Sequence, residues 1–257
     1  MCTPLRRLSS LIFLLAASCA GLLPVAPTNN RPAFNQLAVS GNACGPAALL
    51  TAFRFGDRKT QAVVDALPGI SNKEKLSHTL TAYGQRPSAE LAGRTRWSKA
   101  GVNLPDLAAM ANDLTAGSGL PAVQGEVLQP APGETGPHLL AHCHDRFAAS
   151  LRNGLPPVVS VRRQVLRKAP QGGEAWITID SHFITLTRLE AVTGGESPSF
   201  GFDYIDPWGA RRGSGTFRVS PVPGMGLEAN LPASPVGKRL VHPGEETVVN
   251  LSAAVVR

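Results

Sequence analysis

The chain is poor in aromatic and in charged residues. Phe, Trp and Tyr make up 5% of the 257 residues, so we expect a core built mostly from Ala, Leu and Val. Charged residues amount to 17%, while 43% hydrophobic residues suffice for a substantial core. The sequence shows no internal repeat and no apolar run long enough for a mature membrane-spanning helix. It also has no glycine-rich phosphate loop, so we expect no nucleotide cofactor.

Residues 1–18 have the pattern of a secretory signal peptide. A basic start precedes an apolar stretch that ends at Leu15, and small residues then lead directly to Cys19. This order resembles the lipobox of bacterial lipoproteins, in which signal removal leaves the cysteine as a lipid-carrying amino terminus. We therefore expect a lipid on Cys19, a membrane anchor in the bacterial cell envelope and a tether over 19–33. Ordinary cleavage, with Cys19 incidental, is the alternative.

Cysteine is scarce, with four residues in the whole chain. If the signal is removed and Cys19 is acylated, only Cys44 and Cys143 remain in the mature domain. An oxidising envelope permits a disulfide between them, which is the structural alternative to a functional thiol.

The formal net charge is +7, and the basic residues gather at 162–168. No aromatic residues interleave with this cluster, as they would on many nucleic-acid-binding surfaces, so we expect no nucleic-acid partner. The cluster is better explained as a solvated hairpin edge that faces anionic envelope polymers.

The apolar periodicity changes along the chain. Helical spacing predicts helices within 44–55, 60–70, 73–84, 103–117 and 137–154. Alternation predicts strands within 156–166, 174–192, 199–209 and 214–220. Helices first and an antiparallel sheet second indicate an α+β fold. We expect one domain over 34–220, and a C-terminal extension or an edge strand over 221–257.

Cys44 stands at the start of an alanine-rich helix, in NACGPAALL (42–50). The first turn of a helix has free backbone N–H groups, and together with the helix dipole they favour a thiolate over a thiol. Pro46 fits the same turn, because its missing N–H has no role there. The position therefore favours a reactive thiol.

His182 and Asp206 are conspicuous polar residues in the predicted strands. His182 shares a strand face with Ile184 and Leu186, and Asp206 ends an aromatic-rich strand. Taken alone, His182 suits a core position and Asp206 a turn cap. Together with Cys44 they form the thiol, imidazole and carboxylate set of nucleophilic acyl transfer.

Three blocks, NACGPAALL (42–50), SHFITL (181–186) and DYIDPWG (203–209), resemble the papain-like cysteine peptidases, and in particular the bacterial branch related to bacteriocin leader-processing (double-glycine) peptidases. The resemblance covers roughly residues 34–220. It implies a papain-like fold, with an N-terminal helical half that carries the cysteine helix and packs on a C-terminal antiparallel β-sheet. By the same match Cys44 is the nucleophile, His182 the general base and acid, and Asp206 the orienting acid.

The family also uses a glutamine shortly before the nucleophile in its oxyanion hole. Gln36 is the candidate, eight residues before Cys44 and slightly farther than the usual spacing. Asn42 is the alternative, and the backbone N–H of Cys44 would supply the other donor.

A rival cluster lies in HLLAHCHD (138–145), where His138 and His142 are one helical turn apart and resemble a zinc-ligand pair. Adjacent Cys143 and His144 point to different sides of a helix, so we expect a polar helix surface and no metal.

These observations predict an envelope-anchored cysteine peptidase that hydrolyses peptide or related amide bonds through a thioester, without a cofactor, on a peptide or protein substrate. No ATP-transporter segment accompanies the domain, so leader processing itself is not expected. Two alternatives stay open: a non-catalytic binding or assembly lipoprotein, and an acyltransferase or peptidoglycan amidase that uses the same three residues.

Overall fold

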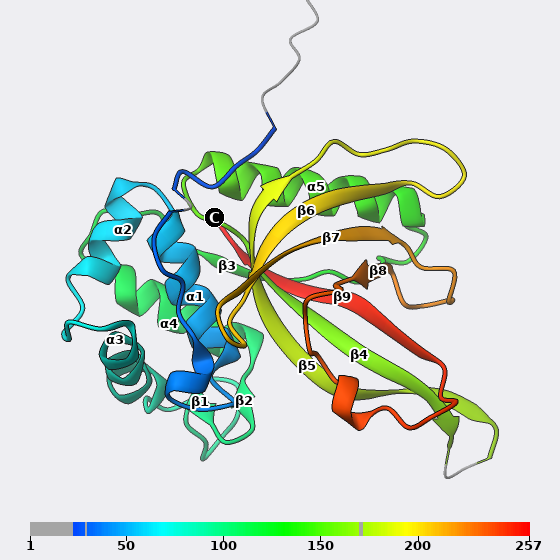
Figure 1. Ribbon diagram of the computed structural model, residues 1–257, viewed down its shortest axis with the longest axis horizontal. Coiled ribbons are helices and arrows are strands. Elements are labelled where there is room, and N and C mark those ends of the chain that lie inside the picture. Colours follow the sequence, from blue (N-terminus) through cyan, green and yellow to red (C-terminus); the bar gives the residue numbers. More distant parts are fainter. Residues whose placement is uncertain (1–22, 29, 170–171) are drawn as a thin grey trace, which may run out of the picture.

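Figure 1 shows the computed structural model, which describes residues 23–28, 30–169 and 172–257; the expected signal peptide and Cys19 lie outside these ranges. The helices of this part of the chain are α1 (Cys44–Phe55), α2 (Arg58–Asp65), α3 (Asn72–Thr79), α4 (Leu104–Thr115) and α5 (Gly136–Arg152). A π-helical turn (Leu80–Gly84) follows α3, and 3₁₀ turns form at Gln36–Ala38 and Lys238–Leu240. The strands are β1 (Trp97–Ser98), β2 (Gly101–Val102), β3 (Gln124–Val127), β4 (Val158–Lys168), β5 (Glu174–Leu189), β6 (Ser199–Asp206), β7 (Arg211–Val219), β8 (Leu227–Asn230) and β9 (Thr247–Val256).

The long strands close into an antiparallel barrel. Strands β4 to β8 pair with one another in chain order, and β9 pairs with both β4 and β8, which completes a ring of six strands. A further strand, β3, pairs with β9. The expected papain-like arrangement, with an N-terminal helical half packed on an open C-terminal sheet, is therefore wrong. The sheet folds back on itself, and α5 packs against it separately from helices α1 to α4 (Figure 1).

Irregular pairing explains why the sheet closes. Strand β4 has a register shift against each of its two neighbours, and β5 has one against β6 just after Leu186. Such irregularities bend a strand and increase its twist. The bent strands bring Asn250 of β9 beside Glu228 of β8, which is the pairing that closes the ring.

The segment 221–257, expected to be an extension or an edge strand, contributes two strands of the barrel. Strand β9 lies between β3 and β4 and is buried along nearly its whole length. Leu251 packs in the core inside the sheet, whereas Val255 packs in the core formed around helices α1 to α4. An edge strand was one of the two expectations, but β9 is covered on both faces, and a strand of this kind lacks the regular alternation that would indicate its place in a sheet.

Helix α1 is the centre of the helical core. All its residues after Cys44 are buried, and the Thr185 hydroxyl of β5 donates to the carbonyl of Ala48 (2.8 Å). A methyl group on Gly45 would come within 2.4 Å of Val102 Cγ1, so glycine allows the first turn to pack tightly on its neighbours. The tip of α1 is therefore fixed against the same strand that carries His182.

Part of the expected tether pairs with the barrel. The backbone N–H of Ala26 donates to the carbonyl of Thr187 (2.7 Å), and that of Leu189 donates to the carbonyl of Pro24 (2.9 Å). Within the described ranges, every helix is too short or too polar to span a bilayer.

Candidate active site

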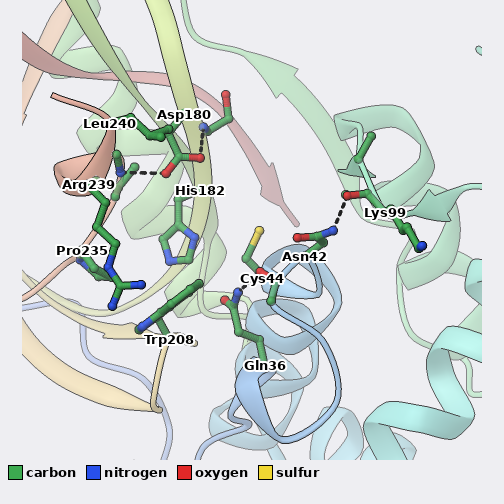
Figure 2. A pocket seen from close by; sticks show the side chains of 16 residues that line it. Gln36, Asn42, Cys44, Lys99, Asp180, His182, Trp208, Pro235, Arg239 and Leu240 are labelled. Atoms are coloured by element: carbon green, nitrogen blue, oxygen red, sulfur yellow. Dashed lines mark hydrogen bonds between the residues drawn. The ribbon is translucent and has the colours of Figure 1, made fainter.

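A pocket of about 240 Å³ opens where the tip of α1 meets the barrel (Figure 2). Its walls come from the turn before α1, the β1–β2 hairpin, β5, the end of β6 and the loop between β8 and β9. Cys44, His182 and Gln36 line it, and the carboxylate of Asp206 reaches the His182 ring from the end of β6. Residues far apart in the chain thus meet in one small space.

Cys44 is the first residue of α1, as its sequence position predicts. Among the α-helices of the described ranges, α1 alone begins without a side-chain cap. The other four are capped by Asp57, Ser71, Asn103 and Thr135. The first backbone N–H groups of a helix have no acceptor within the helix, so those at the tip of α1 are available to a ligand or to a negative charge.

His182 is oriented by a buried carboxylate. Its Nε2 is 2.8 Å from Oδ1 of Asp206, and both side chains are almost inaccessible to solvent. Thr185 of β5 pairs with Ile205 of β6, which places Asp206 one residue farther along β6 toward His182. Because Nε2 is used by the carboxylate, Nδ1 is the ring nitrogen left for Cys44, and Figure 2 shows both side chains facing the pocket.

The charges of His182 and Asp206 stabilise each other. Burial alone would lower the pKa of His182, but hydrogen bonds and charge interactions with Asp206 and Cys44 outweigh it and raise that pKa to about 10. Burial would raise the pKa of Asp206, but His182, the Ser234 hydroxyl and the Trp208 backbone N–H hold it below its ordinary value. The hydrogen bond between them thus favours the charged form of both the imidazole and the carboxylate.

The two candidates for the oxyanion hole differ in burial and in hydrogen-bond partner. Gln36 is almost fully buried and lines the pocket, with Nε2 donating to the carbonyl of Gly41, which leaves its second amide proton unassigned. The Asn42 side-chain amide instead donates to the carbonyl of Lys99 in the β1–β2 hairpin (Figure 2). Each amide has one N–H beyond the bond given, and both residues line the pocket, so burial is what favours Gln36: its side chain is almost inaccessible to solvent, whereas Asn42 is exposed.

Several lining residues were missed by the sequence analysis. Asp180, two residues before His182, and Arg239, on the loop between β8 and β9, both line the pocket, and Ser234 of the same loop is buried beside Asp206. Asp180 lies on β5 with His182, whereas the positions of Ser234 and Arg239 depend on closure of the barrel, which brings their loop against β5 and β6. No local pattern in the sequence reports the position of that loop, but the two-residue spacing from His182 could have indicated Asp180.

The other cysteine and histidine residues of the described ranges do not line the pocket. Cys44 and Cys143 are both free thiols, and Cys143 is fully buried in the barrel core, where burial and then the charges of Glu134 and Glu126 raise its pKa to about 12. His144 turns to the carbonyl of Glu190 (3.0 Å). Within the described ranges, no group of three or more His, Cys, Asp or Glu side chains is arranged to hold a metal ion.

Comparison of the chain with protein-family models, with curated proteins and with solved structures finds no match, so the interpretation of this site depends on its own geometry.

Proposed function

We propose that the protein is a cysteine hydrolase that cleaves peptide or related amide bonds through a thioester. One observation carries the proposal. Cys44, at the uncapped tip of α1, shares a pocket with His182. The Nε2 atom of His182 is hydrogen-bonded to the fully buried carboxylate of Asp206. A nucleophile, a base and an orienting acid in this relation form the functional unit of nucleophilic acyl transfer.

The first step forms the thioester. The Cys44 thiolate attacks the carbonyl carbon of the substrate, and the carbonyl electrons move to the oxygen. When the carbon–nitrogen bond breaks, its electron pair stays on the leaving nitrogen, which takes the proton from Nδ1 of His182. The amine departs, Cys44 carries the acyl group and His182 is neutral.

Water completes the reaction. Nδ1 of His182 takes a proton from the attacking water, whose oxygen adds to the thioester carbon. Collapse of this intermediate breaks the carbon–sulfur bond and releases the acid, so the thiolate and the imidazolium are restored. Asp206 stays ionised throughout and stabilises the imidazolium that each cycle regenerates.

Two donors are suited to the developing oxyanion. The backbone N–H of Cys44 is free of helical bonding because this residue begins α1, and the second amide proton of Gln36 lies in the same pocket. Fixed donors aimed at a developing negative charge typically accelerate acyl transfer by about 10²–10³ each.

The chemistry is complete without a cofactor, because nucleophile, acid, base and oxyanion donors all come from side chains and backbone. We propose a peptide or protein substrate and, from the lipobox-like sequence before Cys19, a lipid-anchored place in the bacterial envelope. The similarity of the three sequence blocks to bacterial double-glycine peptidases supports the peptide substrate; it does not extend to the fold.

Turnover of a proteome-derived peptide library by the purified full chain in mild detergent tests the proposal. We expect new amino termini by mass spectrometry, with ¹⁸O from labelled water in the new carboxylates. Cys44→Ser should abolish them, whereas Cys143→Ser, a matched change outside the pocket, should leave them unchanged. An added amine found in the products instead of water would indicate an acyltransferase. No turnover, or turnover that survives Cys44→Ser, would contradict the proposal and favour a binding lipoprotein.

A further inference from the structure

We propose that the substrate carries a carboxylate close to the bond that is cleaved, and that Arg239 binds it. This inference rests on the proposed function and names a substrate class for the same pocket. It starts from the charged side chains that line the pocket, namely Lys99, Asp180, His182 and Arg239.

Arg239 is a cation without a counter-charge. It is exposed, and its guanidinium has no hydrogen bond or ion pair with any residue in the described part of the chain. Figure 2 shows this guanidinium on the His182 side of the pocket, near Trp208. Five N–H donors in a planar fork suit a carboxylate, which can accept two of them at once.

The one carboxylate among the lining side chains is already used. Asp180 accepts the backbone N–H of Ser181 on Oδ1 (2.9 Å) and that of Gly237 on Oδ2 (2.7 Å). Its charge also interacts with that of half-buried Arg163. Asp180 therefore anchors the loop between β8 and β9 and does not neutralise Arg239.

Hydrogen bonds with three side chains, those of Asp180, Arg163 and Arg167, hold the backbone around Arg239 in place. Nε of Arg163 donates to the carbonyl of Val236 (2.6 Å), and a guanidinium nitrogen of Arg167 donates to the carbonyl of Leu240 (3.2 Å). Gly237 has a positive φ of 60°, and a side chain there would collide with Arg163. A fixed turn reduces the conformational entropy that binding must remove, so Arg239 is well placed to recognise a charged group.

Lys99, on the opposite wall, is the second cationic residue of the lining. It lies on the β1–β2 hairpin beside Asn42, and its ammonium group has no partner among the described residues. Arg239 is therefore the cationic side chain that Figure 2 shows on the same side as His182, whereas the Lys99 ammonium points away from Cys44. A cation in the position of Arg239 favours anionic substrates over neutral ones of the same shape.

Alkylation of Cys44 by two small reagents tests the inference without a known substrate. Iodoacetate and iodoacetamide have nearly the same size but differ by one negative charge. We would measure the ratio of their second-order rates with Cys44 at pH 7 in the full chain, for the wild type, Arg239→Gln and Arg211→Gln. The last variant removes an equal charge from a position that does not line the pocket.

We expect Arg239→Gln to lower the iodoacetate-to-iodoacetamide ratio by about two- to fivefold, the range for a partly exposed charge pair. The rate with neutral iodoacetamide is the reference within each variant, and 0.5 M salt should reduce the effect on the ratio. A ratio that is unchanged in Arg239→Gln, or that falls equally in Arg211→Gln, would overturn the inference. The proposed function is tested separately with His182→Ala. It fails if this change leaves the iodoacetamide rate unaltered.

The carboxylate can belong to an acidic side chain or to the end of a substrate chain, and protection of Cys44 by peptides distinguishes the two. Three acetylated pentapeptides serve as probes: one with a central Glu and a C-terminal amide, one with a central Gln and a free C-terminus, and one with a central Gln and an amide. We expect one of the charged peptides to protect at lower concentration than the neutral one, and Arg239→Gln to remove the difference. Equal protection by all three, protection by none, or a difference that survives Arg239→Gln would overturn the assignment.

Discussion

Replacing Asp206 with Asn removes one negative charge from the buried side of the site and little else. The Asn oxygen can still accept the hydrogen bonds of His182 Nε2 and of the Trp208 backbone N–H, both 2.8 Å long in the wild type. The imidazolium of His182, however, loses the buried charge that stabilises it. We therefore expect a folded variant in which His182 binds its proton less tightly.

The size of the effect follows from the environment of His182. A single opposite charge within hydrogen-bond distance typically changes a pKa by about one to three pH units, or roughly 1.4–4 kcal/mol of interaction. The pKa of His182, about 10 in the wild type, should fall by that amount in Asp206→Asn. Imidazole ¹⁵N NMR across pH 5–11 measures it directly, with His182 assigned from its absence in His182→Ala.

Asp180→Asn is the matched control, because it makes the same change in the same pocket on a carboxylate that bonds only to backbone N–H groups. It should move the pKa of His182 much less. A wild-type His182 that titrates near its ordinary value of 6.5, or a midpoint that Asp206→Asn leaves in place, would refute the buried ion pair.

The same pair gives the free energy of unfolding a defined pH dependence. The folded-state pKa of His182 is raised, so its contribution is fully present below about 6.5 and is lost as the pH rises toward about 10. The pKa of Asp206 is lowered, so its contribution is present above its ordinary 3.8 and is lost as the pH falls through the lowered value. Urea titrations should show the largest difference between wild type and Asp206→Asn in the window between these limits. A difference that stays constant up to pH 10 would contradict the assignment.

Two further substitutions test the packing that holds the site. Gly45→Ala should lower the free energy of unfolding by about 1–3 kcal/mol in urea titrations, because the new methyl group would lie 2.4 Å from Val102 Cγ1. Gly41→Ala is the control: a methyl group there meets no atom within 4 Å, so the free energy of unfolding should change by less than about 0.5 kcal/mol. Equal effects of the two changes would show that the α1 tip is not tightly packed. Lys75→Met should cost about 2–3 kcal/mol, because the buried Lys75 ammonium donates to three backbone carbonyls at the end of α2, and exposed Lys73 in the same helix should tolerate the same change. If Lys75→Met leaves the free energy of unfolding unchanged, the Lys75 ammonium does not have this role.

The sequence predicted what local pattern determines. Gly45, Pro46 and the apolar run after them predict that a helix begins at Cys44, and α1 does begin there. The alternation around His182 predicts a strand with its ring on the face of Ile184 and Leu186, and β5 has this form. Both features depend on neighbours within a few residues, so they can be read without the fold.

What could not be predicted depends on contacts between distant parts of the chain. Asn250 pairs with Glu228 only because irregular strands bend the sheet into a ring, and hydrophobic alternation does not report such bends. The loop that carries Ser234 and Arg239 reaches the site through this closure. The missing information is therefore the pairing of β9 with β4 and β8, and it is also what made the expected open sheet wrong.

The most direct test of the central claim is the rate of Cys44 alkylation by iodoacetamide against pH, in the full chain and in His182→Ala, read by peptide mass spectrometry. Cys143, fully buried in the barrel core, is the internal control, because it becomes reactive only if the protein unfolds. The account predicts fast alkylation of Cys44 already at pH 6, and a much slower reaction in His182→Ala while Cys143 stays protected. A rate that rises only near pH 8.5, as for an ordinary thiol, and is the same in both proteins would contradict it.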